Sequence, residues 1–110
     1  MTDDSCLFCR IIAGEIPAEM VARDDHHVAF RDINPAAPTH LLVVPRDHHV
    51  DLDAFVADGG DASRTLAFIS STADQLGLRG AYRLQVNVGA AAGQEVFHLH
   101  WHLLSSRNTS

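Results

Sequence analysis

Three histidines alternate with large apolar residues near the C-terminal end of the chain, in residues 97–104. Successive side chains of a strand point to opposite faces, so this period of two predicts a strand over the whole segment. His98, His100 and His102 would then share one face, with neighbours about 6.5–7 Å apart. A row of imidazoles at that spacing can hold one phosphate group or one metal ion. A half-buried strand that merely carries histidines is disfavoured, because adjacent imidazoles repel one another on protonation.

The middle histidine, His100, is the best placed of the three to attack phosphorus, because both flanking imidazoles can reach the group it attacks. An imidazole is a competent nucleophile when an acceptor holds its other nitrogen. His102 would then donate a hydrogen bond to a phosphoryl oxygen or to the leaving atom. The glycine-bearing loop at residues 93–95 offers backbone N–H groups, and it could converge with Asn87 on the same pocket. These residues by themselves indicate a site for a phosphate or a metal ion.

A second group of potential ligands begins with Cys6 and Cys9, whose two-residue gap lets both thiolates bind one zinc ion. Cysteines this close together cannot staple a fold. A thioredoxin-like redox pair would follow a strand, and only five residues precede Cys6. A closed zinc site would need two further ligands. The alternative is a pair of free thiols on a buried helical turn.

Helices are predicted where apolar residues recur at helical spacing. A short helix is expected at residues 7–12, with Asp4 or Ser5 as its cap and Gly14 after its end. Residues 51–56 are expected to form a short helix or a turn. A longer helix is expected at about residues 62–76, capped by Asp61. The residues predicted for its buried face are Leu66, Ile69, Ala73 and Leu76.

Strands are predicted by alternation or by short apolar runs bounded by turn residues. The segments are 20–23, 28–31, 40–44, 82–88 and 97–104, with a tight hairpin at residues 24–27. The run at 40–44 is continuously apolar, which is typical of a strand covered on both faces. This order of elements predicts one α+β domain over residues 1–110, with a mainly antiparallel five-stranded sheet and two helices.

Composition limits the classes of partner. The formal charge of −6 argues against a duplex nucleic acid, although a local cluster of donors can still hold a small anion. No apolar run approaches the about 20 residues of a membrane helix, so no membrane partner is expected. The first four residues lack the basic start of a signal peptide, so a cytoplasmic location is expected.

Residues 98–104 match the signature His-φ-His-φ-His-φ-φ, with φ apolar, of the histidine triad family. Other segments resemble the Hint branch of that family in the same order, over nearly the whole chain. These segments are 8–12, 15–17, 29–33, 37–45 and 93–97. Several independent matches in the right order make the resemblance specific.

The resemblance implies a nucleotide hydrolase or transferase in which the middle histidine forms a transient nucleotidyl-imidazole, and water releases a nucleoside monophosphate. His100 would be the nucleophile, with His102 at the phosphate and leaving group and His40 supporting the row. The residues implied to hold the nucleotide are Asn87, Gly93 and the backbone of Gln94, Glu95 and Val96 at the phosphate, Asp32 at the ribose hydroxyls, and Leu7, Phe8, Ile11, Phe30 and Ile33 at the base. Two acceptor oxygens on Asp32 suit a vicinal diol, which favours ribonucleotides.

The resemblance also completes the metal site. His48 and His98 would join Cys6 and Cys9 around a structural zinc ion, with His49 as the rival of His48. The family further implies a purine nucleotide or conjugate as ligand, no organic cofactor, and a homodimer formed through the strand beside the long helix and the neighbouring helix.

Two departures bear on specificity. Glu95 stands where relatives often carry a hydroxyl residue, and its carboxylate is expected to point away from a phosphate. The chain also lacks the aromatic C-terminal tail of eukaryotic relatives. The favoured activity is that of a nucleoside phosphoramidase. The alternatives are a diadenosine-polyphosphate hydrolase and a nucleotide-binding module with vestigial activity, which the intact triad argues against.

Overall fold

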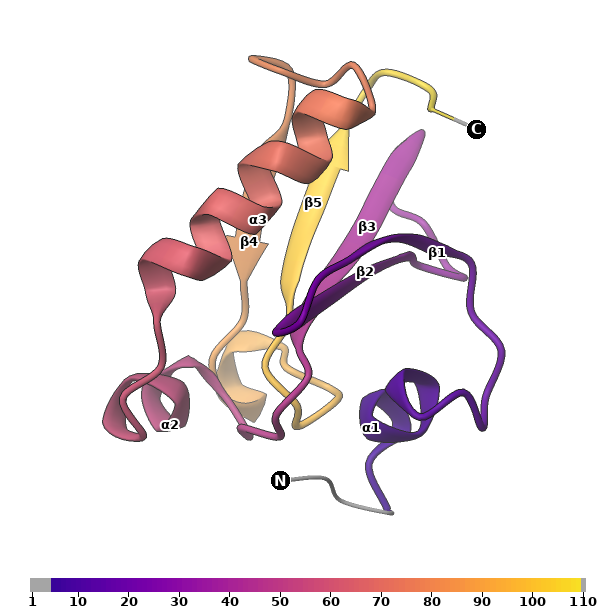
Figure 1. Ribbon diagram of the computed structural model, residues 1–110. Coiled ribbons are helices and arrows are strands. Elements are labelled where there is room, and N and C mark those ends of the chain that lie inside the picture. The colour runs from indigo at the N-terminus through magenta and orange to yellow at the C-terminus, as the bar shows by residue number, and fades with distance from the viewer. Residues whose placement is uncertain (1–4, 110) are drawn as a thin grey trace.

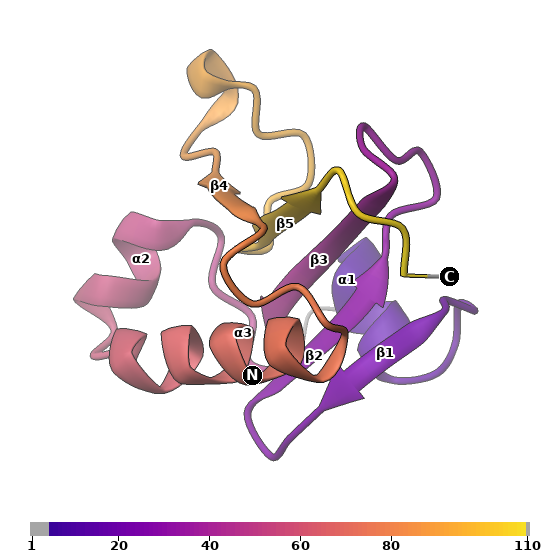
Figure 2. The same cartoon turned by 90° about the horizontal axis from the view of Figure 1, so that it is seen from above.

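A five-stranded antiparallel sheet forms the centre of the protein, which a computed structural model describes over residues 5–109 (Figure 1). The strand order is β1-β2-β3-β5-β4, and Figure 2 shows the strands fanning from β1 at one edge to β4 at the other. The strands are β1 (Met20–Arg23), β2 (His27–Arg31), β3 (Thr39–Pro45), β4 (Arg83–Val86) and β5 (Trp101–Ser105). The expected α+β fold with an antiparallel five-stranded sheet is confirmed.

The described residues contain three α-helices, because the segment at residues 51–56, expected as a short helix or a turn beside the two predicted helices, forms a helix. They are α1 (Leu7–Ile12), α2 (Leu52–Ala57) and α3 (Ala62–Gln75), with a short 3₁₀ helix at Ala90–Ala92. The additional helix, α2, is capped by Asp51, whose side chain accepts from the N–H of Ala54. Of the two caps expected for α1, Asp4 lies outside the described residues, and the observed cap is Cys6. No helix within residues 5–109 is long and apolar enough to cross a membrane.

Both faces of the sheet are covered, because α1 and α3 lie on opposite sides of it (Figure 1). Strand β3 shows the consequence: Leu41 and Val43 pack in the core beneath α3, whereas Leu42 and Val44 pack in the core beneath α1. Alternate residues of one strand therefore enter two cores. This explains why residues 41–44 are apolar without interruption.

The buried face of α3 differs from the predicted one. Leu66 is 50% exposed, and the buried residues are instead Thr65, Phe68, Ile69, Thr72 and Ala73. Their spacing still fits one helical stripe, but two members are threonines, which an apolar pattern omits. Thr72 can be buried because its hydroxyl donates to the carbonyl of Phe68 at 2.9 Å. Burial of a polar group needs such a partner.

Strand β5 begins at Trp101, so the predicted strand over residues 97–104 is wrong in its first half. Pairing with β3 starts at Trp101 opposite Val43 and would next reach Pro45, which has no N–H to donate and whose carbonyl accepts from the His98 ring at 2.8 Å. The N–H of Leu99 donates instead to the carbonyl of His49 at 2.7 Å. The two strands therefore separate before they reach His98.

Candidate functional site

Side chains of residues 97–104, the histidine segment, still point alternately to the two faces of the sheet, although only the second half of the segment is a strand. Leu99, Trp101 and Leu103 lie in the core under α3. The histidines turn towards the other face, where the edge of Phe8 on α1 packs against His100 with ring centres 5.1 Å apart. The rings of His100 and His102 are 5.0 Å apart.

His100 is held with one ring nitrogen available. Its Nδ1 lies 2.9 Å from the backbone carbonyl oxygen of His98, which can only accept, so Nδ1 carries the proton. Burial lowers the pKa of His100, so the neutral ring is favoured and Nε2 keeps its lone pair. A neutral imidazole in this tautomer is the form that can attack an electrophile.

The ring of His102 is oriented by a chain of hydrogen bonds that starts at the backbone. The N–H of Ala36 donates to Nδ1 of His40 at 3.0 Å, so the proton of His40 is on Nε2. That Nε2–H lies 2.9 Å from Nδ1 of His102, which must accept. Burial and the neighbouring imidazoles lower the pKa of His102. Its remaining proton therefore lies on Nε2, as a donor.

A cavity of about 390 Å³ opens beside His100, within the size range of small-molecule sites. It brings together ten of the predicted residues, from α1, β2 and the loops that follow β2 and precede β5. They are His100, Leu7, Phe8, Ile11, Phe30, Asp32, Ile33, Gly93, Glu95 and Val96. Ile33 is 88% exposed at the rim, an unusual position for a large apolar side chain.

Three residues predicted for the phosphate, Asn87, Gln94 and His102, are not among those that line this cavity. The Asn87 amide donates to the carbonyl of Ala92 at 2.7 Å. Gln94 is buried, and its N–H donates to the carbonyl of Gly89 at 3.1 Å. Asn87 and Gln94 therefore brace the loop before the histidine segment, in which Gly93 has a φ of +88° that favours glycine.

The next two N–H groups, those of Glu95 and Val96, have no acceptor within residues 5–109. Both residues line the cavity. Adjacent unpaired N–H groups of this kind are able to hold an anion. Glu95 itself, expected to point away from a phosphate, lines the same cavity as His100.

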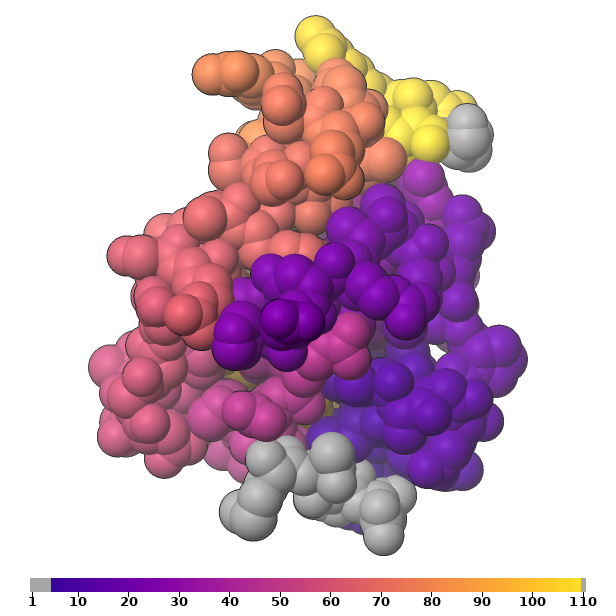
Figure 3. Space-filling model, in the orientation of Figure 1, coloured from indigo at the N-terminus to yellow at the C-terminus, as the bar shows by residue number. Residues whose placement is uncertain are grey.

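Sequence reasoning missed several residues of the wall: Ile16, Pro17, Ala18, Arg31, Asn34 and Leu42. The period of two along β3 would have found Leu42, because it shares a face with His40. The guanidinium of Arg31 is bound by Glu19 at 2.9 Å and by the carbonyl of Thr109 at 2.9 Å. Figure 3 shows the C-terminal residues, in yellow, lying against purple residues from the first half of the chain. No local sequence signal connects Arg31 with Thr109.

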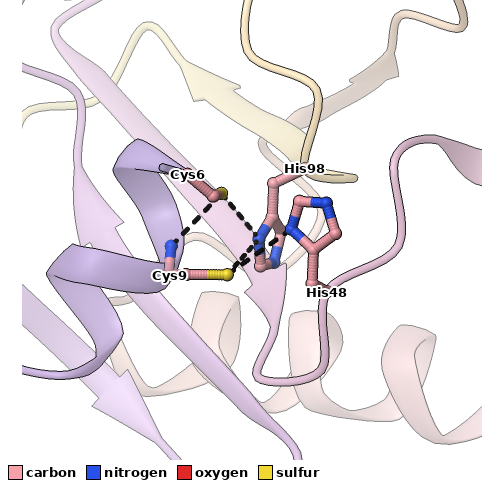
Figure 4. A group of neighbouring side chains, drawn as sticks. All are labelled: Cys6, Cys9, His48 and His98. Atoms are coloured by element: carbon pink, nitrogen blue, oxygen red, sulfur yellow. Dashed lines mark hydrogen bonds between the residues drawn. The ribbon is translucent and has the colours of Figure 1, made fainter. Parts of the chain in front are cut away.

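Two cysteines and two histidines meet between α1 and the start of the histidine segment (Figure 4). Sγ of Cys6 lies 3.3 Å from Nδ1 of His98, and Sγ of Cys9 lies 3.4 Å from Nδ1 of His48. One ligand atom from each residue lies within 4.8 Å of the other three. The arrangement offers two sulfur and two nitrogen ligands, a set that suits a tetrahedral zinc ion.

The tautomer of His98 fits this purpose. Its Nε2–H donates to the carbonyl of Pro45 at 2.8 Å, and burial lowers its pKa to about 4, so Nδ1 presents a lone pair to the thiols. His49, the rival ligand, lies elsewhere, because its Nδ1 contacts a carboxylate oxygen of Asp58 at 2.8 Å. The four residues can therefore hold a metal ion without His49.

An antiparallel sheet that carries a row of imidazoles beside a cavity of small-molecule size defines a class of protein. The family model for the HIT domain matches residues 13–109. The chain is 39% identical to protein HitA from Neisseria gonorrhoeae over 94% of this chain and 97% of that protein. The chain therefore belongs to the HIT family, and the expected family is confirmed.

Solved structures agree with this assignment. The chain is similar to a HIT family hydrolase from Legionella pneumophila, with 42% identity, a TM-score of 0.86 and 96% coverage of each chain. It is also similar to a histidine triad protein from Clostridium difficile, with 38% identity, a TM-score of 0.90, and coverage of 100% and 97%. A zinc-bound histidine triad protein from Mycobacterium smegmatis shares 31% identity, with a TM-score of 0.72 and coverage of 94% and 76%. These relatives support a hydrolase, and a similar solved structure, 33% identical, is that of a histidine triad nucleotide-binding protein from Candida albicans.

Proposed function

We propose that the protein is a nucleoside phosphoramidase, which hydrolyses purine nucleoside 5′-phosphoramidates through a covalent nucleotidyl intermediate on His100. The observation that carries this proposal is the state of His100. Its Nδ1 is bound to the carbonyl of His98 at 2.9 Å, and its ring lines the cavity. The lone pair of Nε2 is therefore available to a phosphorus atom in that cavity.

The reaction has two displacements at phosphorus. Nε2 of His100 attacks, the P–N bond breaks, and the amine leaves with the bonding electron pair and a proton from Nε2 of His102. A water molecule then attacks the phosphorus of the nucleotidyl-imidazole and gives its proton to His102. The N–P bond breaks, His100 is regenerated, and the nucleoside monophosphate is released. His40 acts as a positioning residue, because its Nε2–H holds Nδ1 of His102 at 2.9 Å.

The cavity wall supplies the nucleotide contacts. The base would lie among Leu7, Phe8, Ile11, Phe30 and Ile33, which explains the exposure of the first and last of these side chains. Asp32 would accept from the ribose hydroxyls. Its orientation is fixed because one carboxylate oxygen accepts from the N–H of Asn34 at 2.9 Å. The unpaired N–H groups of Glu95 and Val96 would bind phosphate oxygens.

A structural zinc ion would be held by Cys6, Cys9, His48 and His98. Bound by four protein ligands, zinc supplies no open position for chemistry. Its contribution would be to fasten α1, which carries Phe8 and Ile11 of the cavity wall, to the histidine segment.

A direct test compares adenosine 5′-phosphoramidate with diadenosine polyphosphate. We expect kcat/KM to be roughly a hundredfold higher for the phosphoramidate. The polyphosphate carries additional phosphate groups, and an anion buried in the cavity needs a cationic partner. The only arginine that lines the described cavity is Arg31, and Glu19 and Thr109 already bind it. The measurement is release of AMP with each substrate. A preference for the polyphosphate would indicate the alternative hydrolase, and tight binding of AMP without turnover of either would indicate a binding module.

A homodimer is proposed as the assembly. Strand β4 is an edge of the sheet and carries Leu84, 37% exposed, while α3 carries Leu66, 50% exposed. Light scattering should return twice the mass of one chain. The paired variant Leu66→Asp and Leu84→Asp should return the mass of one chain, and a single-chain mass for the unchanged protein would contradict the proposal.

A further inference from the structure

A second hollow opens beside the His100 cavity and shares part of its wall. It has a volume of about 390 Å³ and has Leu7, Glu95 and Val96 in common with the cavity. Its other lining residues are Ser5, Cys6, His48, Val50 and Phe97. The two spaces are therefore neighbours, and Glu95 belongs to the lining of both.

The hollow has an apolar wall that is exposed to solvent. Leu7, Val50 and Phe97 are 43%, 45% and 48% exposed, although each has a large apolar side chain. Exposed apolar residues gathered in one depression are typical of a ligand-binding groove. A hydrocarbon chain of several carbons would cover these side chains and remove them from water.

The charge at the junction of the two spaces is negative. The Glu95 carboxylate is exposed and has no hydrogen bond or ion pair with any of residues 5–109. The chain contains no lysine, so its eight basic residues are all arginines. Arg31 is the only one of them among the described lining residues of the two spaces, and Glu19 and Thr109 bind its guanidinium. A cationic group would thus be attracted to Glu95 and an anionic group repelled.

We infer that this hollow is the leaving-group subsite, and that Glu95 makes it selective for amines that carry a second, positively charged group on a hydrocarbon chain. The inference rests on the proposed function and names its substrate class. The bond that breaks is still the P–N bond, and His102 still supplies the proton. The second ammonium group does not react, since it only lies near the Glu95 carboxylate while the hydrocarbon contacts Val50 and Phe97.

The test uses three adenosine 5′-phosphoramidates that differ only at the far end of a six-carbon amine: those of diaminohexane, aminohexanol and aminohexanoate. We expect kcat/KM to fall in that order, with about a tenfold difference between the first and the last, which corresponds to about 1.4 kcal/mol. Raising the salt concentration should reduce this ratio, because exposed charges are screened. Absence of turnover with all three would overturn the proposed function and this inference together.

Three variants locate the effect. Glu95→Gln should bring the ratio to within about twofold of unity, because the side chain keeps its size and loses its charge. Val50→Lys, which adds a positive charge to the lining of the hollow, should favour aminohexanoate. Asp53→Asn makes the same charge change as Glu95→Gln at an exposed position on α2 outside both spaces, and should leave the ratio unchanged. Turnover of all three compounds with a ratio near one, or a ratio that neither Glu95→Gln nor Val50→Lys alters, would overturn the inference alone.

Discussion

Replacing His100 with glycine should lower kcat for an adenosine phosphoramidate by at least about ten-thousandfold, because the variant lacks the attacking nitrogen. Binding of AMP should change little, since the apolar wall, Asp32 and the N–H groups of Glu95 and Val96 remain in place. The measurements are single-turnover kinetics for the chemical step and calorimetry for AMP. Rapid denaturation of the unchanged enzyme during turnover should also trap one adenylyl group per chain on His100.

Free imidazole provides a sharper form of this experiment. It can enter the space left by the ring, attack the same phosphorus and then be hydrolysed in solution, so it should restore part of the rate of His100→Gly. The control is His26→Ala, which removes an exposed imidazole that lies outside the His100 cavity and should leave kcat unchanged. Full activity in His100→Gly would remove the residue from the mechanism.

The strands could be predicted from the sequence because their signal is local: apolar and polar residues alternate between neighbouring positions of the chain. The prediction was wrong where hydrogen bonds with groups elsewhere in the chain decide the structure. The histidine segment alternates from residue 98, yet β5 begins only at Trp101, because Pro45 has no N–H for the ladder and the N–H of Leu99 donates to the carbonyl of His49 at 2.7 Å. On α3, Thr65 and Thr72 replaced Leu66 on the buried face because backbone carbonyls satisfy their hydroxyls. Both errors concern partners that a pattern of apolar residues does not contain.

The site shows the same division. Residue types and spacing predicted the imidazole row and the cysteine pair. The sequence does not show which N–H groups of the preceding loop lack an acceptor. That depends on the turn between Gly89 and Gln94, in which the N–H of Gln94 donates to the carbonyl of Gly89 at 3.1 Å. Similarly, His48 and His49 are adjacent in sequence, and only the path of the chain after β3 brings the first to Cys9 and the second to Asp58.

Loss of the proposed zinc ion should destabilise the protein more than removal of any surface contact. A ligand at a thousand times its dissociation constant stabilises the folded state by about 4 kcal/mol. For a domain of this size that corresponds to a decrease in Tm of about 15–30 °C on removal. Protein purified without chelator should contain about one equivalent of zinc, and Cys9→Ser should contain little and unfold at the lower temperature. Replacement with cobalt should give the absorption bands of thiolate ligation in the unchanged protein and not in the variant.

The adjacent histidines supply a matched pair of variants. His48→Gln should lose zinc and stability because Nδ1 of His48 lies 3.4 Å from the sulfur of Cys9, whereas His49→Gln should retain one equivalent of metal.

Loss of zinc should also affect catalysis at His100. The carbonyl that fixes Nδ1 of His100 belongs to His98, whose own ring would be a zinc ligand, so removing the metal loosens the support of the nucleophile. In His48→Gln we therefore expect kcat to fall, and the affinity for AMP to fall as well, because α1 carries Phe8 and Ile11 of the cavity wall. Equal zinc content and equal Tm in the two variants would place the fourth ligand elsewhere, and less than about 0.2 equivalents in the unchanged protein would contradict a structural zinc site.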